Sequence, residues 1–295
     1  MSTGEMKDML TEELSRKLDS LRDYIRSLGS LAVGFSGGVD STLMLAAAHE
    51  VLGDKALAVT ACAESVPERE MAEAKAFCEQ HGIRQIIVTV EQMSEESFRS
   101  NSPDRCYHCK RAIFSRIGQI AAENGIEYVA EGSNLDDLGD YRPGLRAVDE
   151  LSVKSPLREA GLTKSDIRKI SKALGLPTWS KPSYACLASR FVYGEQITRE
   201  KLRMVEKAED FLIGRGFVCE RVRVHGKMAR IEVPAEDISR LACEENRSAV
   251  FEEFRKIGFE FVTLDLGGYR TGSMNATLFK NASGVLASME LNKDM

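Results

Sequence analysis

Residues 31–45 read LAVGFSGGVDSTLML, and this stretch decides the fold. A short apolar run is followed by a loop that contains Gly37 and Gly38, and then by good helix formers that end at Gly53. The order strand, loop, helix points backbone N–H groups and the positive end of a helix at one spot, which attracts phosphate. The stretch therefore predicts a phosphate-binding loop.

The loop carries small polar side chains beside its glycines. The hydroxyls of Ser36 and Ser41 can contact phosphate, Asp40 can help to hold Mg²⁺ or cap the helix, and Gly37 and Gly38 let the backbone approach closely. No lysine follows the second glycine, so the Walker pattern G-x-x-x-x-G-K-S/T is absent. We expect a nucleotide that is cleaved between its α and β phosphates. The alternative is a tight turn in which Asp40 is only a cap.

Strand and helix patterns alternate on both sides of this loop. An amphipathic stripe predicts a helix that ends at Gly29, and strands and helices follow one another from Gly53 to Gly132. A further helix is expected after Thr163, which is a suitable N-cap. We predict an α/β fold with a doubly wound parallel sheet over residues 1–195.

The pattern changes from about Ile197 onward. A helix is expected from Thr198 to Gly214 and another from Pro234 through Ile257, with short strands over 217–226, 227–233 and 259–268. This order predicts a smaller C-terminal α+β domain over residues 196–295, with a mixed or antiparallel sheet.

Composition limits the function classes. The chain has 295 residues, 43% hydrophobic and 29% charged, which is ordinary for a globular enzyme. A net charge of -5 argues against a protein that grips nucleic acid, and no stretch predicts a membrane span or an export signal. We expect a cytoplasmic protein that acts on a small molecule, with no nucleic acid and no membrane partner.

Seven cysteines in such a chain are better explained as thiols or ligands than as a disulfide framework. Cys106 and Cys109 have the C-x-x-C spacing at the start of an expected helix, where the helix dipole lowers the pKa of a thiol. Cys186 lies in a loop-like segment near Arg190. The three thiolates can bind zinc, with His108 or water as the fourth ligand, or a 4Fe-4S cluster with one open iron. A redox pair or unrelated thiols are the alternatives. The remaining four are expected to pack inside the fold: Cys62, Cys78, Cys219 and Cys243.

Two further segments hold candidate binding residues. EGSNLDD follows a predicted strand at the edge where doubly wound sheets bind ligands, and Ser65 follows another. In ERVRVHG, Arg221 and Arg223 alternate onto one face of a strand, which suits a bidentate grip on phosphate or, alternatively, surface ion pairs. From EGSNLDD we expect contacts to AMP, phosphate or metal by Gly132, Ser133, Asn134 and Asp136, unless the segment is a plain turn.

The motif SGGVDS resembles the PP-loop of the ATP pyrophosphatases, which activate a carbonyl or carboxyl group by adenylylation. Along nearly the whole chain, NSPDRCYHCK, EGSNLDDLGDYRPG, SPLREAGLTKSDIRKI, PSYACLASR, RVRVHG and LDLGGYRTGSMN are similar to the ATP-dependent sulfur transferase family LarE. That resemblance implies ATP and Mg²⁺, and a small pyridinium mononucleotide as substrate. It also implies sulfur insertion for the nickel-pincer cofactor and a homo-oligomer.

The resemblance also assigns roles to residues. Cys186 matches the sulfur-bearing cysteine of the family, which becomes dehydroalanine in members that have it alone. Because Cys106 and Cys109 are added here, the chain looks like the subset in which three cysteines hold a 4Fe-4S cluster that supplies sulfide. Arg190 is expected to stabilise charge at the reacting carbonyl, or to hold an acidic residue instead. Arg142 is a further candidate for substrate contact.

Three alternatives to the sulfur transferase stay open. A tRNA thiolase of the same superfamily would need a basic surface of RNA size. An amidating synthetase would use ammonia and would not need the cysteines. A nucleotide sensor would bind ATP without releasing pyrophosphate.

Overall fold

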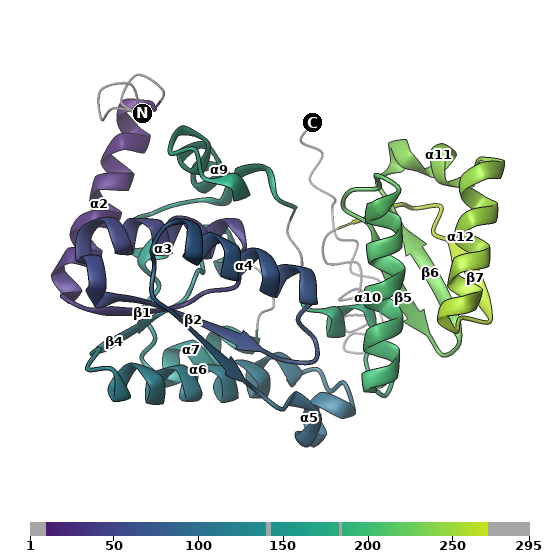
Figure 1. Ribbon diagram of the computed structural model, residues 1–295, viewed down its shortest axis with the longest axis horizontal. Helices are drawn as coiled ribbons and strands as arrows, with labels where there is room; N and C mark the ends of the chain where they lie inside the picture. Colours follow the sequence, from purple (N-terminus) through teal and green to yellow (C-terminus); the bar gives the residue numbers. More distant parts are fainter. Residues whose placement is uncertain (1–9, 140–142, 183–184, 271–295) are drawn as a thin grey trace. The chain divides into compact units, whose positions relative to one another are not determined.

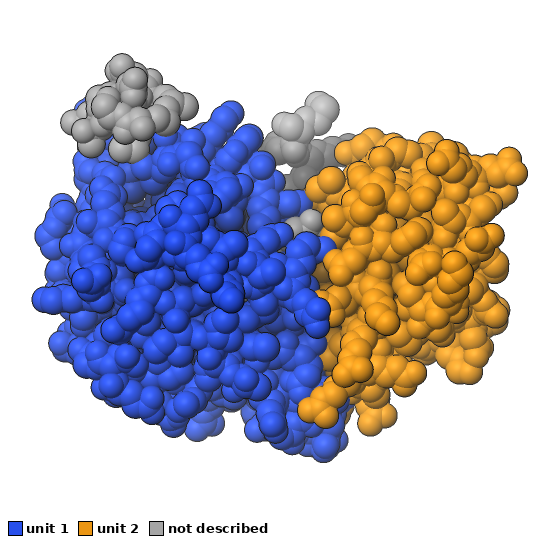
Figure 2. Space-filling model, viewed as in Figure 1, with its two compact units in different colours: residues 1–99, 104–186 blue, residues 100–103, 187–295 orange. Residues whose placement is uncertain are grey.

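The structure is a computed structural model that describes residues 10–139, 143–182 and 185–270 (Figure 1). Its contacts divide the chain into two compact units (Figure 2). Unit 1 comprises residues 1–99 and 104–186, and unit 2 comprises residues 100–103 and 187–295. The division falls after Cys186, whereas the sequence prediction places a boundary after residue 195.

Unit 1 is built on four parallel strands in the order β3-β2-β1-β4. The strands are β1 (Leu31–Gly34), β2 (Ala56–Cys62), β3 (Gln85–Thr89) and β4 (Tyr128–Ala130). The chain moves outward from β1 to β3 and then returns to the other side of β1, where Val33 pairs with Ala130. The strand order therefore reverses between β1 and β4, the place where such sheets bind ligands beyond their carboxyl ends.

Helices cover both faces of this sheet, which confirms the predicted doubly wound α/β fold (Figure 1). One core includes Leu31 and Val33 of β1, and the other includes Ala32, because neighbouring strand residues point to opposite faces. The first core receives α2 (Glu12–Leu28), α3 (Val39–Leu52), α4 (Glu68–Gln80), α8 (Pro156–Glu159) and α9 (Lys164–Ala173). The second receives α6 (Arg105–Glu123) and α7 (Pro143–Glu150).

Two threonines begin helices as their positions in the sequence predict. The Thr163 hydroxyl accepts from the Asp166 N–H, and the Asp166 carboxylate accepts from the Thr163 N–H, which makes a capping box for α9. In unit 2 the Thr198 hydroxyl accepts from the Lys201 N–H at the start of α10 (Arg199–Gly214). Both expected helix starts are confirmed.

Unit 2 contains a mixed sheet in the order β5-β6-β7. β5 (Arg221–His225) pairs antiparallel with β6 (Met228–Glu232), and β6 pairs parallel with β7 (Phe261–Leu264). The predicted single helix from Pro234 through Ile257 is wrong. The segment begins with a 3-10 turn, and the extended Cys243 separates α11 (Ile238–Ala242) from α12 (Glu244–Ile257). Cys243 is also exposed rather than packed.

Short elements complete the described chain: α5 (Glu96–Arg99) and the 3-10 turns η1 (Gly53–Lys55), η2 (Gln92–Ser94), η3 (Leu135–Gly139), η4 (Pro177–Ser180), η5 (Leu187–Arg190) and η6 (Ala235–Asp237). Within the described ranges, no helix has the length and apolar character that a bilayer crossing requires.

Candidate active site

The glycine loop joins β1 to α3 and is fixed by its own hydroxyls. The Ser36 and Ser41 oxygens lie 3.1 Å apart, and the Ser41 hydroxyl donates to the Gly38 carbonyl at 3.2 Å. Gly37 has φ +70, and a Cβ there would come within 3.3 Å of Ala74, so this position requires glycine. Gly38, not Asp40, is the N-cap of α3. The loop leaves the start of α3 available to an anion.

Asp40 lies in the first turn of α3 and forms an ion pair with Lys164. Burial raises the pKa of the Asp40 carboxyl above its ordinary value, although Lys164 acts in the opposite direction. The Asn134 amide donates to Asp40 at 3.5 Å, which brings the loop after β4 to the start of α3. A divalent cation at this carboxylate would favour its charged form.

The loop after β4 packs closely on α3. A Cβ at Gly132 would lie 3.2 Å from the Ser41 nitrogen, a tight contact that glycine avoids. The polar groups of the loop bond among themselves, because Ser133 donates to Glu131, the Asp136 N–H donates to the Asn134 side chain, and Asp136 accepts from the Lys164 N–H. The expected nucleotide contacts of these residues stay predictions, and the observed bonds are those of an Asx turn.

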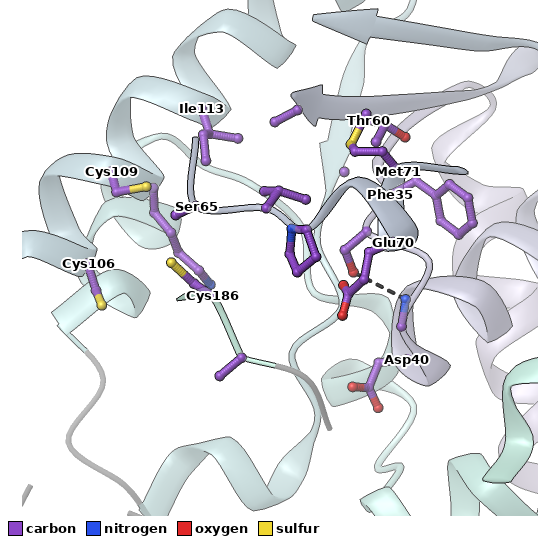
Figure 3. Close-up of a pocket in the computed structure, with 18 of the residues that line it drawn as sticks. Phe35, Asp40, Thr60, Ser65, Glu70, Met71, Cys106, Cys109, Ile113 and Cys186 are labelled. Carbon is purple, nitrogen blue, oxygen red and sulfur yellow. Dashed lines mark hydrogen bonds between the residues drawn. The ribbon is translucent and has the colours of Figure 1, made fainter. Parts of the chain in front are cut away.

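A pocket of about 460 Å³ opens beside the glycine loop, within the size range of small-molecule sites. Seven of the residues predicted for the site line it: Ser36, Gly38, Asp40, Ser65, Cys106, Cys109 and Cys186. Figure 3 shows the three cysteines on one side of the pocket, and Asp40 and Glu70 on the other. The pocket wall does not include Gly37, Ser41, Gly132, Ser133, Asn134 or Asp136.

Ser65 is 1% exposed, and among the described residues its hydroxyl has no hydrogen-bond partner. A buried hydroxyl without a partner loses free energy unless a ligand or water bonds to it. Its backbone N–H donates to the Gln92 amide oxygen at 3.2 Å. This geometry suits the predicted place of Ser65 at the nucleotide site.

The three cysteines differ in their surroundings. Cys106 and Cys186 are exposed, whereas the Cys109 sulfur is held by the Gln92 amide nitrogen at 2.9 Å. Burial raises the pKa of the Cys109 thiol to about 12, and the nearby Cys186 and Cys106 thiols contribute in the same direction. The expectation that the helix start lowers thiol pKa is wrong for Cys109, because that half-buried residue lies in the second turn of α6 and its thiol loses hydration.

Three thiolates are the right donors for an iron–sulfur cluster with one open iron, and all three line one pocket. Across the described ranges, however, no three side chains of His, Cys, Asp or Glu stand close enough to hold a single metal ion. A four-iron cluster is several atoms wide, so its ligands stand apart. The donor chemistry of the pocket fits the group, and Cys106, Cys109 and Cys186 would hold it.

Sequence reasoning missed several residues of the pocket. Lys181 and Lys164 both line the pocket. Lys181 donates to the Gly37 carbonyl at 3.1 Å, and Lys164 forms an ion pair with Asp40. Gln92 joins Ser65 to Cys109, as described above. The absence of a lysine in the glycine loop was the one signal that cations must come from elsewhere. Arg142 lies outside the described residues.

The predicted arginines of unit 2 are all buried, and Arg190 and Arg223 form ion pairs. Arg190 is 1% exposed, and its Nε and Nη2 both donate to Glu209 at 2.8 Å. Arg223 donates to Glu232 at 2.8 Å, and Arg221 donates to the Glu220 carbonyl and stacks on Tyr269. Burial lowers the pKa of Arg221. Arg190 was predicted either to stabilise charge at the reacting carbonyl or to hold an acidic residue, and its contact with Glu209 is of the second kind. The catalytic role of Arg190 and the phosphate grip of Arg221 and Arg223 stay predictions.

A strand, a glycine loop without lysine and a helix, with a pocket beside the loop, define a nucleotide-binding domain of the PP-loop class. The family model described as NAD synthase matches residues 13–120. The chain is also 28% identical over 221 residues to one of the subunits of the glutamine-hydrolyzing GMP synthase of Thermoplasma volcanium, over 68% of each chain.

Two other relatives match almost from end to end. One is the protein slr1717 of Synechocystis sp., which is 41% identical over 267 residues, covering 90% of this chain and 100% of that one. The other is the pyridinium-3,5-bisthiocarboxylic acid mononucleotide synthase of Lactiplantibacillus plantarum, 39% identical over 268 residues, covering 90% of this chain and 96% of that one. The chain belongs to the family of this synthase, LarE, as its motifs predicted.

Proposed function

We propose that the protein is an ATP-dependent sulfur transferase. It adenylylates a carboxylate of pyridinium-3,5-biscarboxylic acid mononucleotide and converts that group to a thiocarboxylate, in nickel-pincer cofactor biosynthesis. The observation that carries the proposal is that Cys106, Cys109 and Cys186 line the same pocket as the phosphate loop. The name of the Lactiplantibacillus relative, a synthase of the bisthiocarboxylic acid mononucleotide, supports the proposal.

The first step is adenylylation. A carboxylate oxygen of the substrate attacks the α-phosphorus of ATP, the bond to the bridging oxygen of the β-phosphate breaks, and pyrophosphate leaves. The N–H groups at the start of α3 stabilise the negative charge that develops on the phosphates, and Asp40 would hold the Mg²⁺ that neutralises part of that charge. Lys164, paired with Asp40, favours the ionised form of that carboxylate and holds it in position.

The second step transfers sulfur. A sulfur nucleophile attacks the carbonyl carbon of the acyl adenylate, the bond to the phosphate oxygen breaks, and AMP leaves. Cys186 lies in the pocket wall and is exposed, so its sulfur can reach a bound substrate. A 4Fe-4S cluster on the three cysteines would supply sulfide at its open iron. Gln92 would then fix the Cys109 ligand through the hydrogen bond to its sulfur.

The test is to incubate anaerobically prepared protein with Mg-ATP and the pyridinium biscarboxylic acid mononucleotide, and to measure the mass of the nucleotide for oxygen replaced by sulfur. We expect a sulfur-bearing product that disappears in Cys186→Ala. Cys243→Ala is the matched control, because it removes an exposed thiol at the N-cap of α12 in unit 2. An unchanged nucleotide, with pyrophosphate released only when tRNA is added, would overturn the proposal in favour of a tRNA thiolase.

A further inference from the structure

The phosphate loop has no cation of its own, yet a lysine reaches it from a distant segment. Residues 31–45 contain no lysine or arginine. Lys181 lines the pocket, and its ammonium donates to the Gly37 carbonyl of the loop at 3.1 Å. Its side chain is 12% exposed, so the charge stands in a sheltered position beside the expected phosphate site.

The acidic partner of Lys181 is a weak competitor for this charge. The Lys181 ammonium also donates to Glu73 of α4 at 2.6 Å. The Glu73 side chain is 48% exposed, and an ion pair with a solvated partner contributes little free energy. Lys181 can therefore exchange Glu73 for another anion at small cost.

The second lysine beside the loop, Lys164, has a less exposed acidic partner than Lys181 has. Lys164 is paired with Asp40, whose carboxylate is 21% exposed and loses hydration in the fold. Without a metal ion at Asp40, separating that pair would leave a half-buried carboxylate with no cation, which is unfavourable. Of the two lysines, Lys181 is the one whose charge is available to a polyphosphate.

We infer that Lys181 binds the leaving phosphates of ATP, and thus the pyrophosphate product, by exchanging Glu73 for a phosphate oxygen. The inference rests on the ATP use of the proposed function and on no part of the sulfur chemistry.

Isothermal titration of the full chain with Mg-ATP and with Mg-pyrophosphate tests this. Lys181→Met should weaken both ligands by about 10-fold to 100-fold, the range of a lost hydrogen bond to a charged group. Lys181→Arg should restore most of the affinity. Glu73→Gln should bind both ligands as tightly as the unmodified protein or more tightly, because it removes the competing anion.

An ion pair that serves as the control lies on α4, the helix that carries Glu73. Lys75 and Glu79 form an exposed ion pair in α4 that does not line the pocket, so Lys75→Met and Glu79→Gln should change neither affinity. Unchanged pyrophosphate binding in Lys181→Met would overturn the inference. Equal losses in Lys181→Met and Glu73→Gln would also overturn it, because they would show that the ion pair only shapes the loop.

The two proposals fail in different ways. Normal ATP binding with the expected Lys181 effect, but without any sulfur-bearing product, would overturn the sulfur transferase and leave the role of Lys181 intact. No ATP binding by the unmodified protein would overturn both.

Discussion

The charged side chains in the pocket of unit 1 have weak partners, whereas those of the buried Arg190–Glu209 pair in unit 2 have strong ones. In the pocket, Lys181 is shared between a carbonyl and a solvated glutamate, and the Ser65 hydroxyl has no partner among the described residues. In unit 2, Arg190 is fully buried, and Glu209 accepts two of its N–H groups and also the Val222 N–H. Both regions were predicted to bind phosphate.

This difference in partners distinguishes residues that bind a ligand from residues that stabilise the fold. A group that must bind a ligand keeps weak or missing partners, because a strong internal partner would have to be displaced first. A buried charge that stabilises a fold is instead enclosed by its counterion and by extra hydrogen bonds. The substitutions below test this comparison, from the largest expected effect to the smallest.

Glu209→Gln should cause the largest loss of stability. The change removes the carboxylate charge that faces the buried Arg190 guanidinium, and breaking a buried pair in this way costs about 3–5 kcal/mol. Urea unfolding, together with hydrogen exchange of the α10 amides, measures the loss. Glu252→Gln, at an exposed position of α12, is the control and should change stability little. A loss as small as that of the control would place Arg190 among the ligand-binding residues.

Gly37→Ala should be moderately destabilising and should also weaken ATP binding. A left-handed backbone costs a residue with a Cβ about 1–2 kcal/mol, and here the new carbon also meets Ala74. Gly29→Ala is the matched control, because Gly29 has φ +72 with nothing within 4 Å of its added Cβ. Both variants should lose stability in chemical denaturation, and only Gly37→Ala should lose affinity in a nucleotide titration. Equal affinity in both would mean that the loop backbone does not contact the phosphates.

Thr163→Ala and Thr198→Ala should have similar, smaller effects in the two units. Each removes a hydroxyl that caps a helix, which costs about 1 kcal/mol. Hydrogen exchange of α9 and α10 reports each unit separately. Serine at either position should preserve most of the stability. A loss confined to one unit would show that the capping bonds are not equivalent.

Asp40→Asn should change the stability of the ligand-free protein least, within about 0.5 kcal/mol at neutral pH. Burial outweighs Lys164 and raises the folded-state pKa of Asp40, so the folded protein binds a proton more readily than the unfolded chain. The contribution of Asp40 to stability is therefore greatest at low pH and falls as pH rises from its ordinary pKa through the raised one. Denaturation curves across that window should show the unmodified protein losing stability relative to Asp40→Asn.

The same variant should bind Mg-ATP poorly, because it lacks the carboxylate for the metal. A variant that is clearly less stable than the unmodified protein at neutral pH would contradict the expectation and would move Asp40 from the site to the scaffold.

Local order was predictable, and long-range partners were not. The strand, glycine loop and helix over residues 31–45 were predictable because apolar runs, glycines and helix formers act through neighbouring residues. Lys181 and Gly37 are separated by 144 positions, and no local pattern links them. The bond between Gln92 and Cys109 likewise depends on how η2 and α6 meet.

The arginines of unit 2 show a second limit. Alternation places Arg221 and Arg223 on one face of β5, and the structure confirms that strand. Whether this face meets a ligand or the interior depends on acidic residues of other elements, such as Glu209 on α10 and Glu232 on β6. A sequence pattern gives the direction of a side chain within its own strand, but not the chemistry it will encounter.

The helix that begins at the phosphate loop is enclosed on almost every side. α3 buries residues in every turn up to its last: Val39, Ser41, Thr42, Leu43, Met44, Leu45, Ala47 and Ala48. Such a helix cannot slide or tilt without opening the core, so its N–H groups keep one direction before and after a nucleotide arrives. The ordering entropy of the loop is lost when the chain folds rather than when ATP binds. Capture of the phosphates should therefore follow a single exponential whose rate rises in proportion to ATP concentration.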